Sequence, residues 1–437
     1  MNMLTLIFIL IGGAICLLFG FFAVGSVKER KSRASAVCVA ACLFFALLWL
    51  GGLLLFSVFG YILVAVTILA AVFGALFFSP LGTSEPLRIG AIESRVDERD
   101  IMFAREEYQP GSEKHEQYYA MRPEYRDIDD RIRSLPEFLA PGGRFYDEEK
   151  SRYIGAVFKT IRDMTTRVDG TVHGNRAELD ASDATGIVKN LAMKLGASEV
   201  GTALLNPMHV YSHVGRGPEP WGAPIENTHK YAIAFTIEMD YFAVNTAPQM
   251  PTTEESAIQY LNAASISVAL ARFIRTLGYP ARAHISDSNY QIMLPPVAHD
   301  AGLGELGRIG YLISPKYGAR IRLGAVTTDL PLVPNRPITF GVQDFCKKCL
   351  KCAVNCPSGA IPEGNKTLVR GVEKWLLDVV KCIHYWRVAG TDCGICMKVC
   401  PFSHPPTFVH NLVRTGIQRS SFARTVSVWG DDLFYGK

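Results

Sequence analysis

The chain has 437 residues, of which 49% are hydrophobic and 20% are charged. Its formal net charge of +4 is small for this length and gives no reason to expect a nucleic-acid partner. About 350 residues follow the apolar N-terminal region, more than one typical domain requires, so several folded parts are expected.

The first 84 residues are predicted to form a transmembrane anchor, 1–84, of about three helices. Two uncharged stretches flank a charged loop at 28–33, and the second stretch is 51 residues long. One crossing of a bilayer needs about 20 apolar residues, so the second stretch can hold two helices. We expect the turn between them near Ser57 and Gly60.

The basic residues of this loop predict the orientation of the anchor. They are Lys28, Arg30, Lys31 and Arg33, and such residues tend to stay in the cytoplasm. Three crossings then leave the rest of the chain on the cytoplasmic side. The charges follow the first apolar run, and no twin-arginine stretch precedes it, which argues against an export signal. We therefore expect a multi-pass protein of the inner (cytoplasmic) membrane.

Two segments of different character follow the apolar region. Residues 85–150 are charged and broken by prolines, which predicts an irregular connector. Residues 151–335 are predicted to form a catalytic core. Within the core, 231–239 has the β-branched and aromatic residues of a strand, and apolar residues at helical spacing predict a helix that stops at Gly278. Strands and helices without regular alternation indicate the α+β class.

A glycine-rich segment, AGLGELGRIG, occupies 301–310. It contains three glycines at the spacing of a dinucleotide fingerprint, Gly302, Gly304 and Gly307. That fingerprint requires an uninterrupted strand before the glycines, and Pro295 and Pro296 would break such a strand. A nicotinamide site is therefore rejected. The glycines would still let the backbone approach a large flat cofactor, and a plain glycine-rich turn is the alternative.

Two histidines at helical spacing, His209 and His213, could share a metal ion if they lay on one helix. Pro207 and the following run with Gly215, Gly217 and Pro218 oppose a stable helix there. We therefore interpret both as loop histidines rather than metal ligands.

Eight of the eleven cysteines fall within 55 residues. The first four have the pattern C-x2-C-x2-C-x3-C-P and the last three the pattern C-x2-C-x3-C-P. This spacing is typical of a ferredoxin module with two 4Fe–4S clusters, which we place at 336–405, followed by a C-terminal segment at 406–437. Zinc sites or disulfides are the alternatives, but zinc sites usually lack the x3-C-P ending.

The cysteines divide into two sets of four, because three cysteines of one run hold one cubane and the fourth serves the other cluster. The first cluster is assigned Cys346, Cys349, Cys352 and Cys400. The second cluster is assigned Cys356, Cys382, Cys393 and Cys396, with Cys382 replacing the cysteine that the second run omits.

Over 255–436 the chain resembles the corrinoid-dependent reductive dehalogenases, in a membrane-anchored form. The resemblance rests on motifs in the same order: FIRTLGYPAR, AGLGELGRIG, LISPKYGARIRL, TDLPLVP, FGVQDFC and WGDDLFYG. It implies a nitroreductase-like core that binds a cobalamin-type corrinoid base-off, with the ferredoxin module packed against it.

The resemblance also implies an activity, the reductive dehalogenation of an organohalide. In that family a tyrosine donates a proton, an arginine holds it and an asparagine lines the pocket, and these roles fall on Tyr260, Arg322 and Asn289. A guanidinium beside a phenol stabilises the phenolate that remains after proton transfer. The two clusters would relay electrons from a low-potential donor, which could be a ferredoxin, a flavodoxin or a quinol-linked protein.

Two other functions remain open. An epoxyqueuosine-reductase-like enzyme would share the corrinoid and both clusters, and would use an aspartate such as Asp287 as its acid. A membrane-bound ferredoxin subunit would only transfer electrons and would need no corrinoid. The fused anchor argues against the first, and cobalt in the purified protein would argue against the second.

Overall fold

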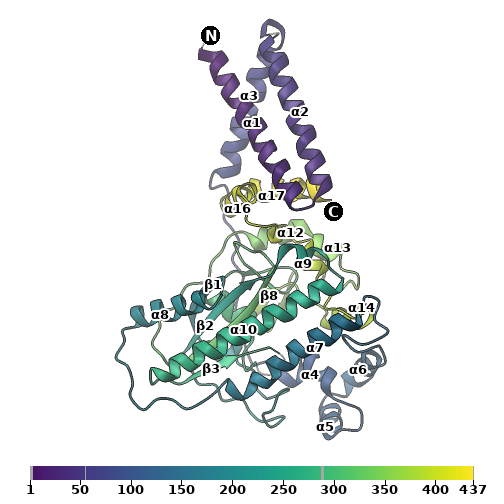
Figure 1. Ribbon diagram of the computed structural model, residues 1–437, viewed down its shortest axis with the longest axis vertical. Coiled ribbons are helices and arrows are strands. Elements are labelled where there is room, and N and C mark those ends of the chain that lie inside the picture. The colour runs from purple at the N-terminus through teal and green to yellow at the C-terminus, as the bar shows by residue number, and fades with distance from the viewer. Residues whose placement is uncertain (1–2, 55, 287–289, 437) are drawn as a thin grey trace. The chain divides into compact units, whose positions relative to one another are not determined.

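The computed structural model describes residues 3–54, 56–286 and 290–436 and divides into two compact units (Figure 1). The first unit combines three separate stretches of the chain: Met1–Pro86, Phe340–Cys349 and His404–Lys437. The second unit combines two stretches: Leu87–Thr339 and Leu350–Ser403. The N-terminal and C-terminal segments of the chain therefore belong to the same unit.

The secondary structure described in the first unit is helical. Its helices are α1 (Met3–Lys28), α2 (Ser32–Leu54), α3 (Phe56–Phe78), α12 (Val342–Cys349), α16 (Phe408–Arg419) and α17 (Ser421–Tyr435). The prediction of three N-terminal helices is confirmed. The turn expected near Ser57 and Gly60 is displaced by a few residues, because α2 ends at Leu54 and α3 begins at Phe56, so that both residues lie in the first turns of α3. Small residues do not end a helix in an apolar segment, where the backbone has no solvent to bond to.

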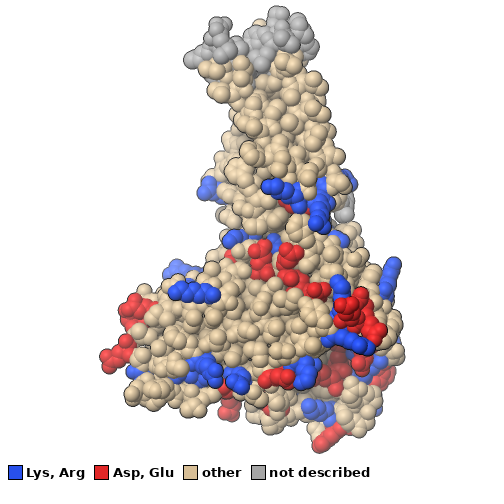
Figure 2. All heavy atoms as spheres, in the orientation of Figure 1, with Lys and Arg blue, Asp and Glu red and all other residues tan. Residues whose placement is uncertain are grey.

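The N-terminal helices have the length and composition of membrane-crossing segments. Ile9–Lys28 of α1 and Ser32–Gly51 of α2 are each long and apolar enough to cross a bilayer, and Val64–Phe78 of α3 is a shorter apolar stretch. Figure 2 shows almost no charged side chains over these helices. The buried Trp49 of α2 packs against α1, where Gly12 leaves room for its indole ring. These helices fit a membrane anchor.

The second unit is built on a four-stranded antiparallel sheet. Its strands, in the order β1-β2-β6-β3, are β1 (Glu199–Leu204), β2 (Tyr231–Glu238), β6 (Ile321–Thr328) and β3 (Ala281–His284). The predicted strand at 231–239 is confirmed by β2. Alternate residues of each strand point to opposite faces, so the sheet supports a separate core on each face.

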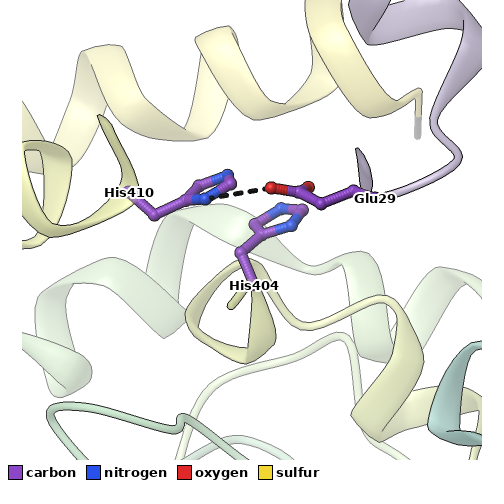
Figure 3. A group of neighbouring side chains, drawn as sticks. All are labelled: Glu29, His404 and His410. Atoms are coloured by element: carbon purple, nitrogen blue, oxygen red, sulfur yellow. Dashed lines mark ion pairs between the residues drawn. The ribbon is translucent and has the colours of Figure 1, made fainter. Parts of the chain in front are cut away.

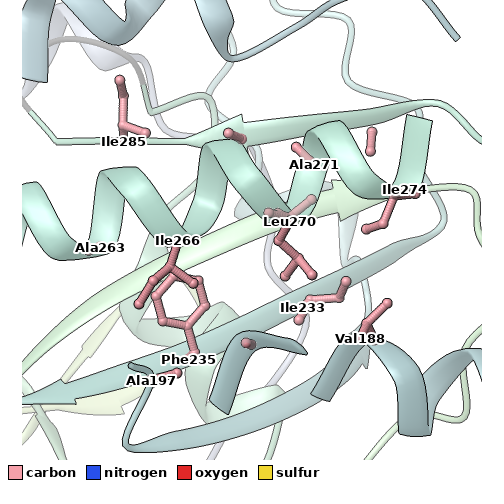
Figure 4. Packing of buried hydrophobic residues seen from close by; sticks show 14 of the residues in the cluster. Val188, Ala197, Ile233, Phe235, Ala263, Ile266, Leu270, Ala271, Ile274 and Ile285 are labelled. Carbon is pink, nitrogen blue, oxygen red and sulfur yellow. The ribbon is translucent and has the colours of Figure 1, made fainter. Parts of the chain in front are cut away.

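One face of the sheet carries the long helix α10 (Met250–Thr276), with α7 (Glu148–Asp163) and α8 (Ala181–Lys194) beside it. Figure 4 shows Leu270 and Ile266 of α10 directed toward Ile233 and Phe235 of β2. All four are at most 3% exposed, and a buried aliphatic side chain contributes roughly 1.5–3 kcal/mol. The predicted helix stop is confirmed, because Gly278 adopts a left-handed φ of +81° just after α10.

The opposite face is covered by α11 (Leu294–Asp300), the β4–β5 hairpin (Glu305–Leu306 and Leu312–Ile313) and loops. Helix α11, not a strand, leads into the glycine-rich segment. This arrangement confirms the rejection of a dinucleotide fingerprint, which depends on a strand at that place.

Shorter elements complete the second unit. They are α4 (Met102–Glu107), α5 (Glu113–Met121), α6 (Arg126–Arg133), α9 (Tyr241–Asn245), α13 (Lys351–Val354), β7 (Thr367–Val369), β8 (Val372–Lys374), α14 (Val379–Ala389) and α15 (Ile395–Lys398), with single 3-10 turns between them. The expected irregular connector is thus partly helical. Tyr108, Tyr118 and Tyr119 form a small buried core there, braced by an ion pair of 2.5 Å between Arg105 and Asp129.

Candidate functional site

Arg322 occupies the second position of β6 and is the centre of the candidate site. Its Nη2 lies 2.6 Å from the Ser256 Oγ and 3.2 Å from the Asp392 Oδ2, and its Nη1 lies 3.7 Å from the Met397 Sδ. Only 11% of its side chain and 8% of that of Asp392 are exposed. Helix α10 and the cysteine-rich region therefore hold the guanidinium from two sides.

Tyr260 lies one turn beyond Ser256 on α10, so the two share a helix face. The guanidinium carbon of Arg322 is 4.9 Å from the centre of the Tyr260 ring, in a cation–π arrangement. Burial alone would lower the pKa of Arg322, but Tyr260 and Asp392 outweigh it and the pKa is raised. The structure thus brings Tyr260 and Arg322 together, and Arg322 stays charged.

The structure does not describe the other two residues for which the sequence predicted a role as an acid or in the pocket. Asn289, predicted to line the pocket, and Asp287, the acid of the alternative function, lie outside the described residues. Tyr290 is described, and burial raises the pKa of its phenol, with Tyr260 adding to the effect. A further half-buried tyrosine, Tyr311, has its pKa raised by burial and by the neighbouring Cys396 and Cys382.

Asp392, like Ser256, is a site residue that the sequence interpretation missed. Its Oδ2 accepts a hydrogen bond of 2.5 Å from the Ser256 hydroxyl, and its Oδ1 accepts one of 2.9 Å from the Thr253 hydroxyl. It immediately precedes Cys393, so one loop joins Arg322 to a predicted cluster ligand. The only available signal was the position of a carboxylate between two cluster cysteines, Cys382 and Cys393, and that alone indicates nothing specific.

The four cysteines assigned to the second cluster lie close enough to influence one another electrostatically. Burial raises the pKa of Cys382 to about 11 and of Cys393 to about 12, and that of Cys396 also rises. In each case other cysteines of the set add to the rise. Four neighbouring thiols suit a 4Fe–4S cubane, which binds them as thiolates. The iron ions would compensate the negative charge of these buried thiolates.

The fourth member, Cys356, sits in a loop rich in donors. Burial would raise the pKa of its thiol, but hydrogen bonds from Ser358 and from backbone N–H groups outweigh that effect and lower it. The Ala360 N–H, for example, lies 3.3 Å from the sulfur. Donors of this kind stabilise a thiolate, so this position also fits an iron–sulfur cluster.

The two cysteine runs share a local backbone geometry. Leu350 has a left-handed φ of 57° before α13, and Gly394 has one of 73° before α15. Each turn stands between the C-x2-C pair of its run, and each run ends at the next cysteine before a proline. The repeat is that expected of a two-cluster ferredoxin module.

The first cluster is less directly described. Cys346 and Cys349 lie on α12 in the first unit, whereas Cys352 and Cys400 belong to the second unit. All four are partly exposed. Their assignment to one cluster stays a prediction from the spacing.

The glycines of AGLGELGRIG are explained by the chain itself. Gly302 has a φ of +73°, and a Cβ there would lie 2.6 Å from the Arg336 carbonyl oxygen. A Cβ on Gly304 would overlap the Ile313 carbonyl. The Gly307 N–H donates a hydrogen bond of 2.9 Å to the Tyr311 carbonyl. Close backbone packing therefore requires at least the first two glycines, and a cofactor contact at the three positions stays a prediction.

The two histidines at helical spacing have separate partners. His209 ends the 3-10 turn Pro207–His209, and its Nε2 lies 3.0 Å from the Asp300 Oδ2. His213 pairs with Asp97 at 3.4 Å. The interpretation as loop histidines is confirmed.

Comparison with known proteins identifies the iron–sulfur part first. Residues 345–404 match the family model of the 4Fe-4S dicluster domain, inside the predicted module. The tetrachloroethene reductive dehalogenase of Sulfurospirillum multivorans is 34% identical over 292 residues, which cover 59% of this chain and 58% of that protein. The protein of the same name from Desulfitobacterium hafniense strain Y51 is 34% identical over 283 residues, covering 54% of this chain and 51% of that protein.

Solved structures lead to the same group. The catabolic reductive dehalogenase NpRdhA superposes with a TM-score of 0.66 at 28% identity, covering 80% of this chain and 48% of that chain. An epoxyqueuosine reductase of Synechococcus sp. RCC307 matches a smaller part, 24% of this chain at 29% identity. The α+β core is thus combined with a 4Fe-4S dicluster domain in one chain. The chain is thus similar to tetrachloroethene reductive dehalogenases over a little more than half of its length, and it spans about half the length of these curated relatives.

Proposed function

We propose that this protein is a membrane-anchored reductive dehalogenase that removes a halogen from an organohalide. One observation carries the proposal: the Arg322 guanidinium lies 4.9 Å from the Tyr260 ring centre and 3.2 Å from the carboxylate of Asp392, the residue directly before the predicted cluster ligand Cys393. A proton donor, a fixed cation and a source of electrons therefore meet within one unit of the protein. Reductive removal of a halide requires both electrons and a proton, so the combination suits this reaction.

The core is proposed to resemble the nitroreductase fold and to bind a cobalamin-type corrinoid base-off beside Tyr260. The fit rests on Arg322, whose buried Nε has no hydrogen-bond partner among the described residues, and on the half-buried phenols of Tyr290 and Tyr311. These donors suit the polar rim of such a cofactor. A reduced corrinoid supplies a strong two-electron reductant for the carbon–halogen bond, and the protein supplies orientation and charge.

Tyr260 is proposed to donate the proton that replaces the halogen. The Arg322 charge over its ring stabilises negative charge on the phenolate after transfer. Ser256 and Asp392 hold the guanidinium at this place by the hydrogen bonds given above, and so act as positioning residues. Asn289 is proposed to line the same pocket.

The two clusters are proposed to deliver electrons singly to the site, from an external low-potential donor. Cys356, Cys382, Cys393 and Cys396 would hold the second cluster, and Asp392 beside Cys393 contacts Arg322. Cys346, Cys349, Cys352 and Cys400 would hold the first cluster. A ferredoxin, a flavodoxin or a quinol-linked protein would serve as the donor.

The anchor is proposed to cross the inner membrane more than once and to leave the catalytic part in the cytoplasm. The basic residues of the loop at 28–33 support this orientation. Enzymatic reporters fused after Lys437 should be active in the cytoplasm. An active periplasmic reporter would overturn the orientation.

The activity is tested with purified protein that contains iron and corrinoid, reduced by a low-potential dye. We would supply 3-bromo-4-hydroxybenzoic acid, which is bound in one NpRdhA structure, and tetrachloroethene, the compound after which both relatives described above are named. Halide release that depends on corrinoid is expected for at least one organohalide. Reduction of epoxyqueuosine-containing tRNA without any halide release would favour the alternative enzyme instead.

A further inference from the structure

A second group of metal-binding side chains lies in the first unit, apart from the cysteines. Glu29 stands in the turn between α1 and α2, His404 precedes α16, and His410 lies in the first turn of α16. Figure 3 shows the Glu29 carboxylate beside the two imidazole rings, which are stacked with their centroids 4.7 Å apart. One ligand atom from each residue can be chosen so that all three lie within 4.8 Å of one another.

The donor atoms are withdrawn from solvent, and several of them lack hydrogen bonds. Glu29 is 5% exposed, and neither carboxylate oxygen has a hydrogen bond of good geometry among the described residues, although the Tyr435 hydroxyl and the His410 ring act on this carboxylate. The buried Nδ1 of His404 has none either. A buried carboxylate without hydrogen bonds is costly, and a bound cation is one of the few ways to remove that cost.

The geometry already approaches that of a coordination sphere. The His410 Nδ1 lies 3.4 Å from the Glu29 Oε1. Two ligands at about 2.0–2.2 Å from a tetrahedral zinc ion stand roughly 3.4 Å apart, so this edge needs no adjustment. The longest edge, at up to 4.8 Å, must shorten by a side-chain movement.

The partners of the imidazoles orient them for ligation. The His404 Nε2 lies 2.9 Å from an Asp431 carboxylate oxygen, which favours the proton on Nε2 and leaves the Nδ1 lone pair available to a metal ion. The His410 Nε2 lies 3.0 Å from the Tyr435 hydroxyl, an equivalent arrangement. A carboxylate behind a histidine is the usual support of a metal-bound imidazole.

The remaining neighbours set limits on the site. The Thr407 hydroxyl lies 2.8 Å from the His410 Nδ1 and would have to turn away on metal binding. Lys31 and Arg414 also act on Glu29, and their positive charges weaken the hold on a cation. Burial lowers the pKa of both imidazoles, so they are neutral near pH 7, which is the ligating form.

We propose that Glu29, His404 and His410 form a binding site for one divalent metal ion of the zinc type. Two imidazole nitrogens and one carboxylate oxygen are a borderline-soft set that suits Zn²⁺ better than Mg²⁺ or Ca²⁺. A metal ion there would join the turn after α1 to the C-terminal helices, and would be independent of the iron–sulfur and corrinoid chemistry.

The test uses the full-length holoprotein in detergent, loaded with Zn²⁺ alone and dialysed. We expect about one zinc ion per chain, and X-ray absorption at the zinc edge should give only nitrogen and oxygen ligands at about 2.0–2.1 Å. Sulfur ligands at about 2.3 Å would mean that zinc occupies cysteine positions, and would overturn the proposal. So would a wild-type protein that retains no zinc.

Variants then assign the ligands. Glu29→Gln and His404→Gln should each lower retained zinc at least tenfold while iron content stays unchanged. His173→Gln, which alters an exposed histidine of the second unit, should retain zinc fully. Equal retention by Glu29→Gln and the wild type would overturn the proposal. The absorption spectrum of the wild type decides the matter even if a variant fails to fold.

Discussion

At the scale of single residues, the candidate site is a chain of contacts from Asp392 through Ser256 and Arg322 to Tyr260. Family resemblance could predict Tyr260 and Arg322, because they follow from counting along motifs. It could not predict Asp392 or Ser256, since a serine inside a helix and an aspartate in a loop have many ordinary roles. Their part in the site depends on tertiary contacts that bring 256, 322 and 392 together.

The first prediction concerns the proton donor. Tyr260→Phe keeps the ring under the Arg322 guanidinium and removes only the hydroxyl. Folding, iron content and corrinoid content should be unchanged, whereas the rate of halide release should fall by roughly a hundredfold or more, as for a lost general acid. Tyr153→Phe, at an exposed tyrosine of α7, is the matched control and should keep full activity. Full activity of the Tyr260 variant would reduce Tyr260 to a packing residue.

The second prediction concerns the support of Arg322. Ser256→Ala removes the hydroxyl that bridges Arg322 and Asp392, at the loss of a charged hydrogen bond worth about 1.5–3 kcal/mol. We expect kcat to fall by roughly tenfold or more with little change in KM, because the guanidinium acts after substrate binding. Ser256→Thr keeps the hydroxyl and should restore much of the loss. An unchanged kcat in Ser256→Ala would exclude the positioning role.

At the scale of secondary-structure elements, the sequence correctly predicted those elements that depend on a local residue pattern. The strand at 231–239, the helix stop at Gly278 and the three N-terminal helices follow from periodicity, glycine chemistry and apolar length. The turn expected near Ser57 and Gly60 was placed a few residues too late, because the small residues of an apolar segment can remain helical. The helices within 85–150 were missed because the many prolines and charged residues of this segment indicate irregular structure. The tyrosines that form its small core are not at a recognisable helical spacing.

The glycine-rich segment gives the third prediction. Gly304→Ala would place a Cβ against the Ile313 carbonyl, and we expect a loss of at least about 3 kcal/mol in the free energy of unfolding. Thermal unfolding of corrinoid-free protein is the measurement, because the predicted loss arises from the chain alone. Gly186→Ala, in open space on α8, is the control and should be neutral or stabilising. If corrinoid-free Gly304→Ala melts like the wild type, the glycine serves another purpose.

The fourth prediction concerns His284 at the end of β3. Its ring is buried, its Nε2 lies 3.0 Å from the Thr327 hydroxyl, and burial holds its pKa well below the ordinary value. Below about pH 6.5 the unfolded chain binds a proton that the folded protein does not, so stability falls as the pH falls. The contribution between pH 7.5 and 5.5 is at most about 1.4 kcal/mol, the limit for a ring that stays neutral in the folded protein.

Urea unfolding of anaerobic protein at both pH values measures this term. In His284→Gln the drop in stability between pH 7.5 and 5.5 should be smaller than in the wild type by up to that amount. His173→Gln, at an exposed position, should show the wild-type drop. An identical pH dependence in wild type and His284→Gln would mean that the folded protein can protonate this ring.

At the scale of the whole molecule, the sequence predicted an apolar anchor, an α+β core and a two-cluster module, and each has an independent signature in composition or spacing. The division into units could not be predicted, because the first unit is assembled from three stretches far apart in sequence. Grouping the N-terminal helices with α16 and α17 requires knowledge of contacts between the two ends of the chain. The same grouping creates the Glu29, His404 and His410 site.

The metal content of anaerobically purified full-length protein tests the central claim most directly, namely that corrinoid and two cubane clusters act together in this chain. We predict about eight iron atoms and about one cobalt atom per chain, with the absorption of reduced 4Fe–4S clusters and of a base-off corrinoid. About eight iron atoms without cobalt, in protein produced with corrinoid available, would contradict the account and indicate an electron-transfer protein. Stoichiometric zinc with little iron would contradict the cluster assignment itself.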